Sequence, residues 1–209
     1  LLTYSRTTTH VLYQGWSLHH ACLGGHEEIV KSLLAMPWID VNQDDKMYGS
    51  TPLHWACLSG RGDHWRVVKM LLRKGGDVRR RDHGGKTALH YACEQGHTKS
   101  AEVMLEREDG IGIINCVDNF GDTPLQKVIN CGHGEMIRVL LSCKGINLKH
   151  SGAASMKTGV TGSAEELIRR GVPMEANDWG NCSQVKHIIE NFMFRSVQDQ
   201  CETETIFIW

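Results

Sequence analysis

Residues 84–97 read GGKTALHYACEQGH, and three other stretches repeat this arrangement of small, apolar and histidine positions. They read GWSLHHACLGGH at 15–26, GSTPLHWACLSG at 49–60 and NFGDTPLQKVINCGH at 119–133. The first leucines of the four stretches are 35, 36 and 36 residues apart: Leu18, Leu53, Leu89 and Leu125. A nearly constant period of this length predicts an array of stacked supersecondary units.

Each repeated stretch is followed by a second apolar pattern with helical spacing. Adjacent apolar residues recur about three to four positions apart, as one buried face of a helix requires. The four sets are Ile29, Val30, Leu33 and Leu34; Val67, Val68, Leu71 and Leu72; Ala101, Val103, Met104 and Leu105; and Ile137, Val139, Leu140 and Leu141. Each unit is therefore predicted to contain two short helices.

Residues that start and stop helices agree with this division. Thr51-Pro52 and Thr123-Pro124 place a capping hydroxyl before a proline at the first helical position. A glycine follows the first helix of each unit, where a left-handed residue is expected: Gly25, Gly60, Gly96 and Gly132. Polar segments typical of turns follow the second helices, at 39–50, 75–85 and 113–122.

This order of turns and helices, with Thr51-Pro52-Leu53-His54 opening a first helix, resembles the ankyrin repeat. The resemblance implies an all-α solenoid of stacked helix-turn-helix units with projecting β-hairpin loops. We expect repeats near 15–48, 49–83, 84–118 and 119–150 and a degenerate repeat over 151–182, which together form one ankyrin repeat domain, 15–182. Two departures are Trp16-Ser17 in place of Thr-Pro, and Gln126 in place of the signature histidine.

The flanking segments complete the expected domain organisation. Residues 1–14 form an N-terminal flank, and an apolar stripe over 183–195 predicts a capping helix that covers the open end of the stack. The tail, 196–209, carries no helical stripe and ends in an apolar tetrapeptide, so we interpret it either as a loosely held, disordered segment or as the result of truncation. The first residue is Leu1 rather than methionine, which indicates a fragment of a longer chain.

The composition argues against several classes of protein. The net charge of −1 gives no overall attraction to nucleic acid or anionic membranes. No apolar run approaches the roughly 18 residues of a spanning helix, and the first twenty residues hold no continuous apolar segment of an export signal. We therefore expect an intracellular protein, cytoplasmic or nuclear, with reduced cysteines and no membrane insertion.

Two candidate chemistries within 84–97 are explained by the repeat instead. A phosphate-binding loop requires a glycine five residues before Gly85, where the chain has Arg80. Histidine and cysteine at the spacing of His90 and Cys93 recur in earlier repeats, so we interpret them as structural rather than as zinc ligands. We expect no catalytic residue, no cofactor and no metal; the protein is predicted not to be an enzyme and to have no small-molecule substrate.

Three local features of the sequence can each be interpreted in two ways. Arg61-Gly62-Asp63 is either an integrin-type tripeptide or a plain turn. The basic run Arg79 to Arg81 is either a solvated hairpin or a contact for an acidic or phosphate-bearing partner. The sequence Asp40-Val41-Asn42 resembles the hairpins that asparaginyl hydroxylases favour in ankyrin repeats, which makes Asn42 a modification candidate; the alternative is an unmodified turn asparagine.

Ankyrin repeats bind proteins through a concave face, and the resemblance places this face on the first helices and the hairpin tips. Trp55 and Tyr91 follow the signature histidines and are expected to be the main contacts, because large amphipathic rings are frequent at interface hot spots. The alternative for Trp55 is partial cover by its neighbouring hairpin. The expected protein-binding set is His20, Leu23, Asp45, Tyr48, Trp55, Leu58, Arg79, Arg81, His83, Tyr91, Glu94, Gln95, Phe120 and Lys127.

Acidic tips beside basic tips favour a protein partner of mixed charge. The predicted function is a non-catalytic protein-protein interaction module, with nucleic acid an unlikely ligand. The alternative is a regulatory or substrate-recruiting segment of a larger multidomain enzyme, such as a kinase or a ubiquitin ligase.

Overall fold

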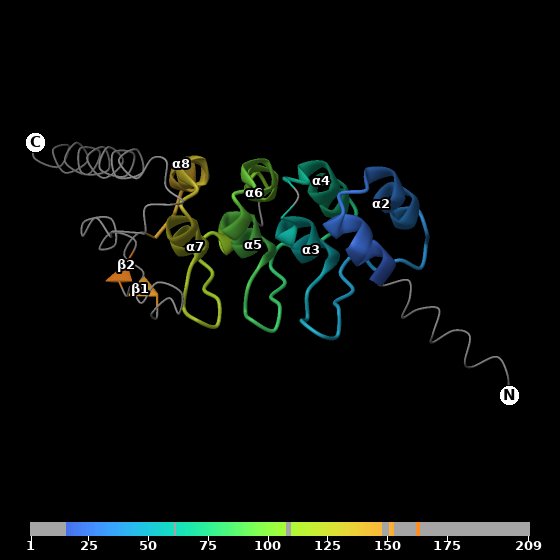
Figure 1. Ribbon diagram of the computed structural model, residues 1–209, viewed down its shortest axis with the longest axis horizontal. Coiled ribbons are helices and arrows are strands. Elements are labelled where there is room, and N and C mark those ends of the chain that lie inside the picture. The colour runs from blue at the N-terminus through green and yellow to red at the C-terminus, as the bar shows by residue number, and fades with distance from the viewer. Residues whose placement is uncertain (1–15, 61, 108–109, 148–150, 153–161, 164–209) are drawn as a thin grey trace, which may run out of the picture.

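The computed structural model describes residues 16–60, 62–107 and 110–147, with two short strands beyond them. The helices fall into four consecutive pairs that stand side by side in one row (Figure 1). The first pair is the helix over 16–23 and α2, Glu27–Leu34. The others are α3, Pro52–Leu58, with α4, Trp65–Arg73; α5, Ala88–Gln95, with α6, Thr98–Leu105; and α7, Pro124–Cys131, with α8, Gly134–Ser142.

Three minor elements complete the described structure. The 3₁₀ helix η1, Gly110–Ile113, follows α6. The two-residue strands β1, Ser151–Gly152, and β2, Gly162–Ser163, pair antiparallel. The predicted N-terminal flank 1–14, capping helix 183–195 and tail 196–209 lie outside the described residues, as does nearly all of the degenerate repeat 151–182.

The first helices begin where the sequence predicts, through reciprocal caps. The backbone N–H of Thr51 donates to His54 Nδ1 at 3.1 Å, and Thr87 makes the same bond to His90. The second ring nitrogen of His54 then reaches the carbonyl of Lys86 in the next unit, at 3.2 Å. Each of these histidines therefore starts its own helix and joins it to the following repeat.

The glycine prediction holds for three of the four positions. Gly25, Gly96 and Gly132 are left-handed, with φ of 67°, 71° and 80°. Gly60 is not among the residues of positive φ, so that expectation is wrong. In this unit the segment between the two helices is longer, residues 59–64, whereas only Gly96 and His97 separate α5 from α6. With this inserted loop, α3 ends in Ser59 with φ −56° and ψ 118° instead of in a left-handed glycine.

The core is a continuous apolar layer between the two rows of helices. The leucines that define the period, Leu18, Leu53, Leu89 and Leu125, are 0–2% exposed. First helices pack on first helices (α3 on α5, α5 on α7) and second helices on second helices (α2 on α4, α4 on α6). The expectation that Ile29 is buried with the rest of its stripe is wrong, because its side chain is 53% exposed.

The loops between units project from one side of the row (Figure 1) and are joined at their tips. The backbone N–H of His83 donates to the carbonyl of Tyr48 at 2.8 Å, and that of Asn119 to the carbonyl of Gly84 at 2.9 Å. Successive loops are thereby held in register. The tips form one ridge, which we call the tip ridge: residues 46–48, 81–84 and 119–120.

Candidate functional site

In the second, third and fourth units, the residue after the signature position binds an aspartate of the loop before its helix. Trp55 Nε1 donates to Asp45 Oδ2 at 2.8 Å, and the Tyr91 hydroxyl donates to Asp82 Oδ2 at 2.6 Å. In the fourth unit, Lys127 Nζ lies 2.8 Å from Asp118 Oδ2 and 2.7 Å from Asp122 Oδ2. Trp55, Tyr91 and Lys127 are all half-buried, so these predicted contacts are held against their loops and only part of each side chain faces solvent.

Asp45 is 3% exposed and therefore forms no part of an outer surface. One carboxylate oxygen accepts the indole N–H of Trp55, and the other accepts the backbone N–H of Tyr48. An aspartate that accepts such bonds stabilises the loop, because a buried charge requires hydrogen-bond partners. From the sequence, Asp45 was expected to be an acidic residue at a loop tip. In the structure, its carboxylate is buried and bonded within the loop.

Aromatic packing covers Trp55 further. Its ring lies edge-on to His20 at 5.3 Å and to Trp16 at 6.3 Å between ring centroids. The alternative interpretation of partial cover is thus the observed one, and the cover comes from the first helix as well as the loop. Trp16, 39% exposed, was absent from the predicted set because it stands at a capping position.

Around Tyr91, opposite charges are paired. Lys86 Nζ lies 2.7 Å from Glu94 Oε1 and 4.9 Å from the centroid of the Tyr91 ring. Burial, followed by the hydrogen bond to Asp82, raises the pKa of Tyr91 above its usual value. This phenol therefore stays protonated and serves as a hydrogen-bond donor rather than as a base.

The tip ridge carries the large apolar side chains that the loops leave uncovered. Met47 is 63% exposed, Tyr48 57% and Phe120 45%. His83 lies between them along the ridge, exposed, with its ring Nδ1 3.2 Å from the carbonyl of Met47. The structure therefore brings together the predicted residues Tyr48, His83 and Phe120.

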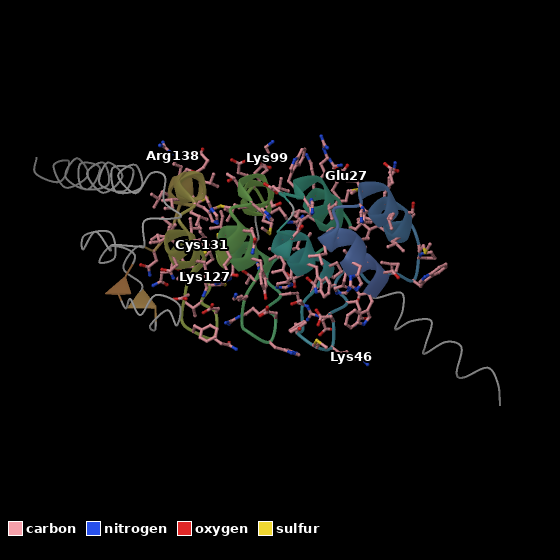
Figure 2. The ribbon with its side chains drawn as sticks, in the orientation of Figure 1. Glu27, Lys46, Lys99, Lys127, Cys131 and Arg138 are labelled. Atoms are coloured by element: carbon pink, nitrogen blue, oxygen red, sulfur yellow. The ribbon has the colours of Figure 1, made fainter. Side chains whose placement is uncertain are left out.

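The remaining residues of the predicted binding set differ in how far their side chains are exposed to solvent. His20, Leu58 and Gln95 are exposed on the first helices, whereas Leu23 and Glu94 are half-buried. In Figure 2, Lys46 lies on the loop edge of the molecule, whereas Glu27, Lys99 and Arg138 lie along the opposite edge formed by the second helices. The tip ridge and the second helices are thus separate faces.

The basic run is only partly available to a ligand. Arg81 donates to the carbonyl of Gly85 at 2.9 Å and to the carbonyl of Val117 in the next loop. Arg79 and Arg80 are exposed, and Arg80 comes within 3.5 Å of the carbonyl of Asn42. Arg81 is therefore a structural link between loops.

Asn42 also joins two repeats. Its amide donates to the carbonyl of Gly75 at 3.0 Å, and its oxygen accepts from the backbone N–H of Asp77 at 2.8 Å. Asn115 makes equivalent bonds two repeats later, to Gly145 and Asn147. Asn42 is half-buried, so a modifying enzyme has to open this contact to reach it.

The repeated histidine and cysteine side chains are buried parts of the repeat structure. Burial lowers the pKa of His90 to about 4, and burial raises the pKa of the Cys22, Cys57 and Cys93 thiols. These three cysteines are free. Among the described residues, no group of histidine, cysteine or acidic side chains could hold a metal ion.

The tripeptide at 61–63 includes a residue with a defined structural task. Asp63 Oδ2 accepts the backbone N–H groups of Lys99 and Ser100 at 2.8 and 3.2 Å, and Oδ1 contacts the Ser100 hydroxyl. The inserted loop of one repeat thereby caps α6 of the next. The carboxylate that an integrin would need is engaged in this cap, which favours the turn interpretation.

Comparison with known proteins agrees with this architecture. A family model described as ankyrin repeats (3 copies) matches residues 13–82 and 61–152. The chain therefore belongs to the ankyrin repeat family, whose members generally act as protein-interaction modules. Within the described residues, no helix has the length and apolarity needed to span a membrane.

Three curated relatives illustrate the range of proteins that contain similar repeats. A putative ankyrin repeat protein of Rickettsia bellii is 36% identical over 43% of this chain and 48% of its own length. The SMC5-SMC6 complex localization factor protein 1 of Bos taurus is 35% identical over 46% of this chain and 9% of its own length. A probable E3 ubiquitin-protein ligase, XBOS32, of Oryza sativa is 31% identical over 59% of this chain and 30% of its own length. The chain thus spans less than half the length of each of these relatives.

Proposed function

We propose that the protein is a non-catalytic module that binds another protein through the tip ridge and the adjacent first helices. The observation that carries this proposal is the exposure of Met47, Tyr48 and Phe120 on loops held in register. A row of large exposed apolar side chains is a feature of interaction sites, since soluble proteins otherwise keep such patches small. Trp55 and Tyr91 contribute from behind the ridge, as half-buried rings whose polar atoms are fixed by Asp45 and Asp82.

The surface offers a partner both charge and apolar contact. Lys46 is exposed on the ridge, and Asp44 and Arg79 are exposed near it in the sequence. We therefore still propose a partner that carries both positive and negative charges, as expected from the sequence. Asp45 is buried, and the exposed Arg81 is bonded to two backbone carbonyls, so fewer charges are available to a partner than the sequence indicates. Apolar contact at the ridge then decides affinity more than charge does.

Affinity capture from cells tests this proposal. The variant Met47→Ser/Tyr48→Ser/Phe120→Ser removes the exposed side chains of the ridge and should lose the proteins that the wild type retains. The matched control is Ile111→Ser, which changes an isoleucine that is 59% exposed in η1 and should retain them. Circular dichroism establishes that both variants fold. Retention of the same proteins by the ridge variant would exclude the ridge as the binding surface.

A second candidate is that the repeats recruit substrates or regulate catalysis within a larger enzyme. The similarity to a probable E3 ubiquitin-protein ligase favours this alternative. A catalytic domain encoded beside these repeats in a longer transcript would support it. With either role, we propose an intracellular location, in the cytoplasm or nucleus.

Modification of Asn42 is a separate proposal. Hydroxylation at this side chain would act on the contact between the first two repeats, because Asn42 bonds to both Gly75 and Asp77. Mass spectrometry of the protein from cells with an active asparaginyl hydroxylase should show a gain of one oxygen at Asn42. An unmodified Asn42 under these conditions would leave it as a structural asparagine.

A further inference from the structure

The first repeat differs from the later repeats at one position of its second helix. The position of Ile29 in α2 corresponds to Val67, Ser100 and Met136 in the later units. Those three side chains are 1%, 0% and 0% exposed, whereas Ile29 is 53% exposed. Ile29 therefore has the chemistry of an interior position without the cover that interior positions receive.

Two further positions show the same contrast. Leu33 is half-buried, whereas the equivalent Leu71, Met104 and Leu140 are all 0% exposed. In the first helices, Ser17 is exposed where Pro52, Ala88 and Pro124 are buried. By contrast, Val30 and Leu34, on the adjacent face of α2, are 0% and 8% exposed, as in the interior of the stack.

The position of α2 in the row explains which side is uncovered. Figure 1 places α2 at one end, with α4 beside it and no other described helix pair beyond it. Each later unit has a described unit before it, whereas the residues that precede the first helix, 1–15, lie outside the described residues. Ile29, Leu33 and Ser17 therefore mark the face that a repeat turns towards its predecessor, which we call the leading face.

The chemistry of the leading face is not that of a terminal cap. Repeats that end a stack need a polar outer surface to remain soluble. Here Ile29 and Leu33 are apolar, and the Ile29 side chain is 53% exposed. The residues fit an interior repeat rather than an end.

We infer that the repeat over 16–48 is an interior repeat, and that a further helix pair of ankyrin type packs on its leading face through Ile29 and Leu33. The face continues the stacking interface that joins the described repeats, which favours a preceding repeat over other occupants. This inference concerns a surface other than the tip ridge and does not depend on the proposed function.

Extension of the stack tests the inference. A copy of residues 84–121, the third repeat with the start of the loop that follows it, is fused to Gly15 in place of residues 1–14, so that Gly15 takes the register position of Asp122. The reference is the same chain with 1–14 deleted. The added repeat should slow amide exchange in α2 by about tenfold or more, because a covered helix opens less often. It should also raise the midpoint of thermal unfolding. Ile29→Glu should abolish both gains in the fused protein while leaving the stability of the unfused full chain unchanged.

Ile111→Glu provides the matched control, since it charges an isoleucine of similar exposure in η1 and should preserve both gains. Three results would overturn the inference. An added repeat that protects nothing would show that the face does not stack. Loss of stability in the unfused chain on Ile29→Glu would show that this chain already covers the face. Sedimentation of the full chain as a dimer that Ile29→Glu dissociates would assign the face to a second copy.

Discussion

At the scale of single residues, the signature histidines act as neutral connectors. The Nδ1 atom of His90 accepts the backbone N–H of Thr87, so the ring proton is on Nε2, which lies 3.2 Å from the carbonyl of Asp122 in the next loop. Burial lowers the pKa of His90 to about 4, although Asp118 opposes this shift. Protonation would place a proton on the nitrogen that has to accept from Thr87, and the cap would be lost.

This chemistry predicts an acid-sensitive stability that glutamine removes. The folded pKa of about 4 lies below the ordinary value of 6.5, so the folded state binds fewer protons between these values. Stability is therefore complete above about pH 6.5 and declines as the pH falls towards 4, by about 2 kcal/mol at pH 5 from this one group. In the fourth unit, Gln126 accepts the equivalent bond from Thr123 at 2.8 Å without titrating.

His90→Gln should accordingly lose about 2 kcal/mol less than the wild type between pH 7.5 and pH 5 in urea denaturation. The His54 pKa is also lowered by burial, so part of the acid sensitivity should remain in the variant. Equal losses for the two proteins would show that His90 is protonated in the folded state or is uncoupled from folding.

At the scale of elements, the helices were predictable and their side-chain partners were not. The leucine period and the threonine caps depend on local sequence, so they place the first helices correctly. The orientation of the Asp45 side chain depends on a tertiary contact, because the indole of Trp55 binds its carboxylate. The end of α3 at Ser59 differs from the other first helices because a longer loop follows it. The position of the first helices could therefore be predicted from the sequence, whereas the partial burial of Trp55 could not. That these helices form the binding face stays a prediction.

The loop between α3 and α4 stabilises the start of α6 in the following repeat. Asp63 caps α6 across a repeat boundary, so Asp63→Ala should destabilise the protein by about 1–2 kcal/mol, as loss of an N-cap does. Asp63→Asn should cost less, because an amide oxygen still accepts from Lys99 and Ser100. The control is Asp44→Ala, which changes an exposed aspartate. Urea denaturation measures all three, and a neutral Asp63→Ala would show that water replaces the cap without cost.

At the scale of the whole molecule, each repeat is stabilised by its neighbours. Stacked units contact adjacent units only, so stability is a sum of repeat and interface contributions. Four of the six tryptophans, Trp16, Trp38, Trp55 and Trp65, lie in the first two repeats. Fluorescence therefore reports mainly on one half of the stack, whereas circular dichroism reports on all helices.

A cavity in the middle of the stack should consequently separate the two signals. Leu89, 0% exposed in α5, packs at the centre, and Leu89→Ala should cost about 2–5 kcal/mol. Because this loss weakens the contacts of the third repeat with both of its neighbours, the two halves should unfold at different urea concentrations. Leu18→Ala removes an equally buried leucine, 1% exposed, at the end of the row, and should loosen the first repeat alone. Coincident fluorescence and circular dichroism transitions in Leu89→Ala would show that the repeats unfold as one cooperative unit.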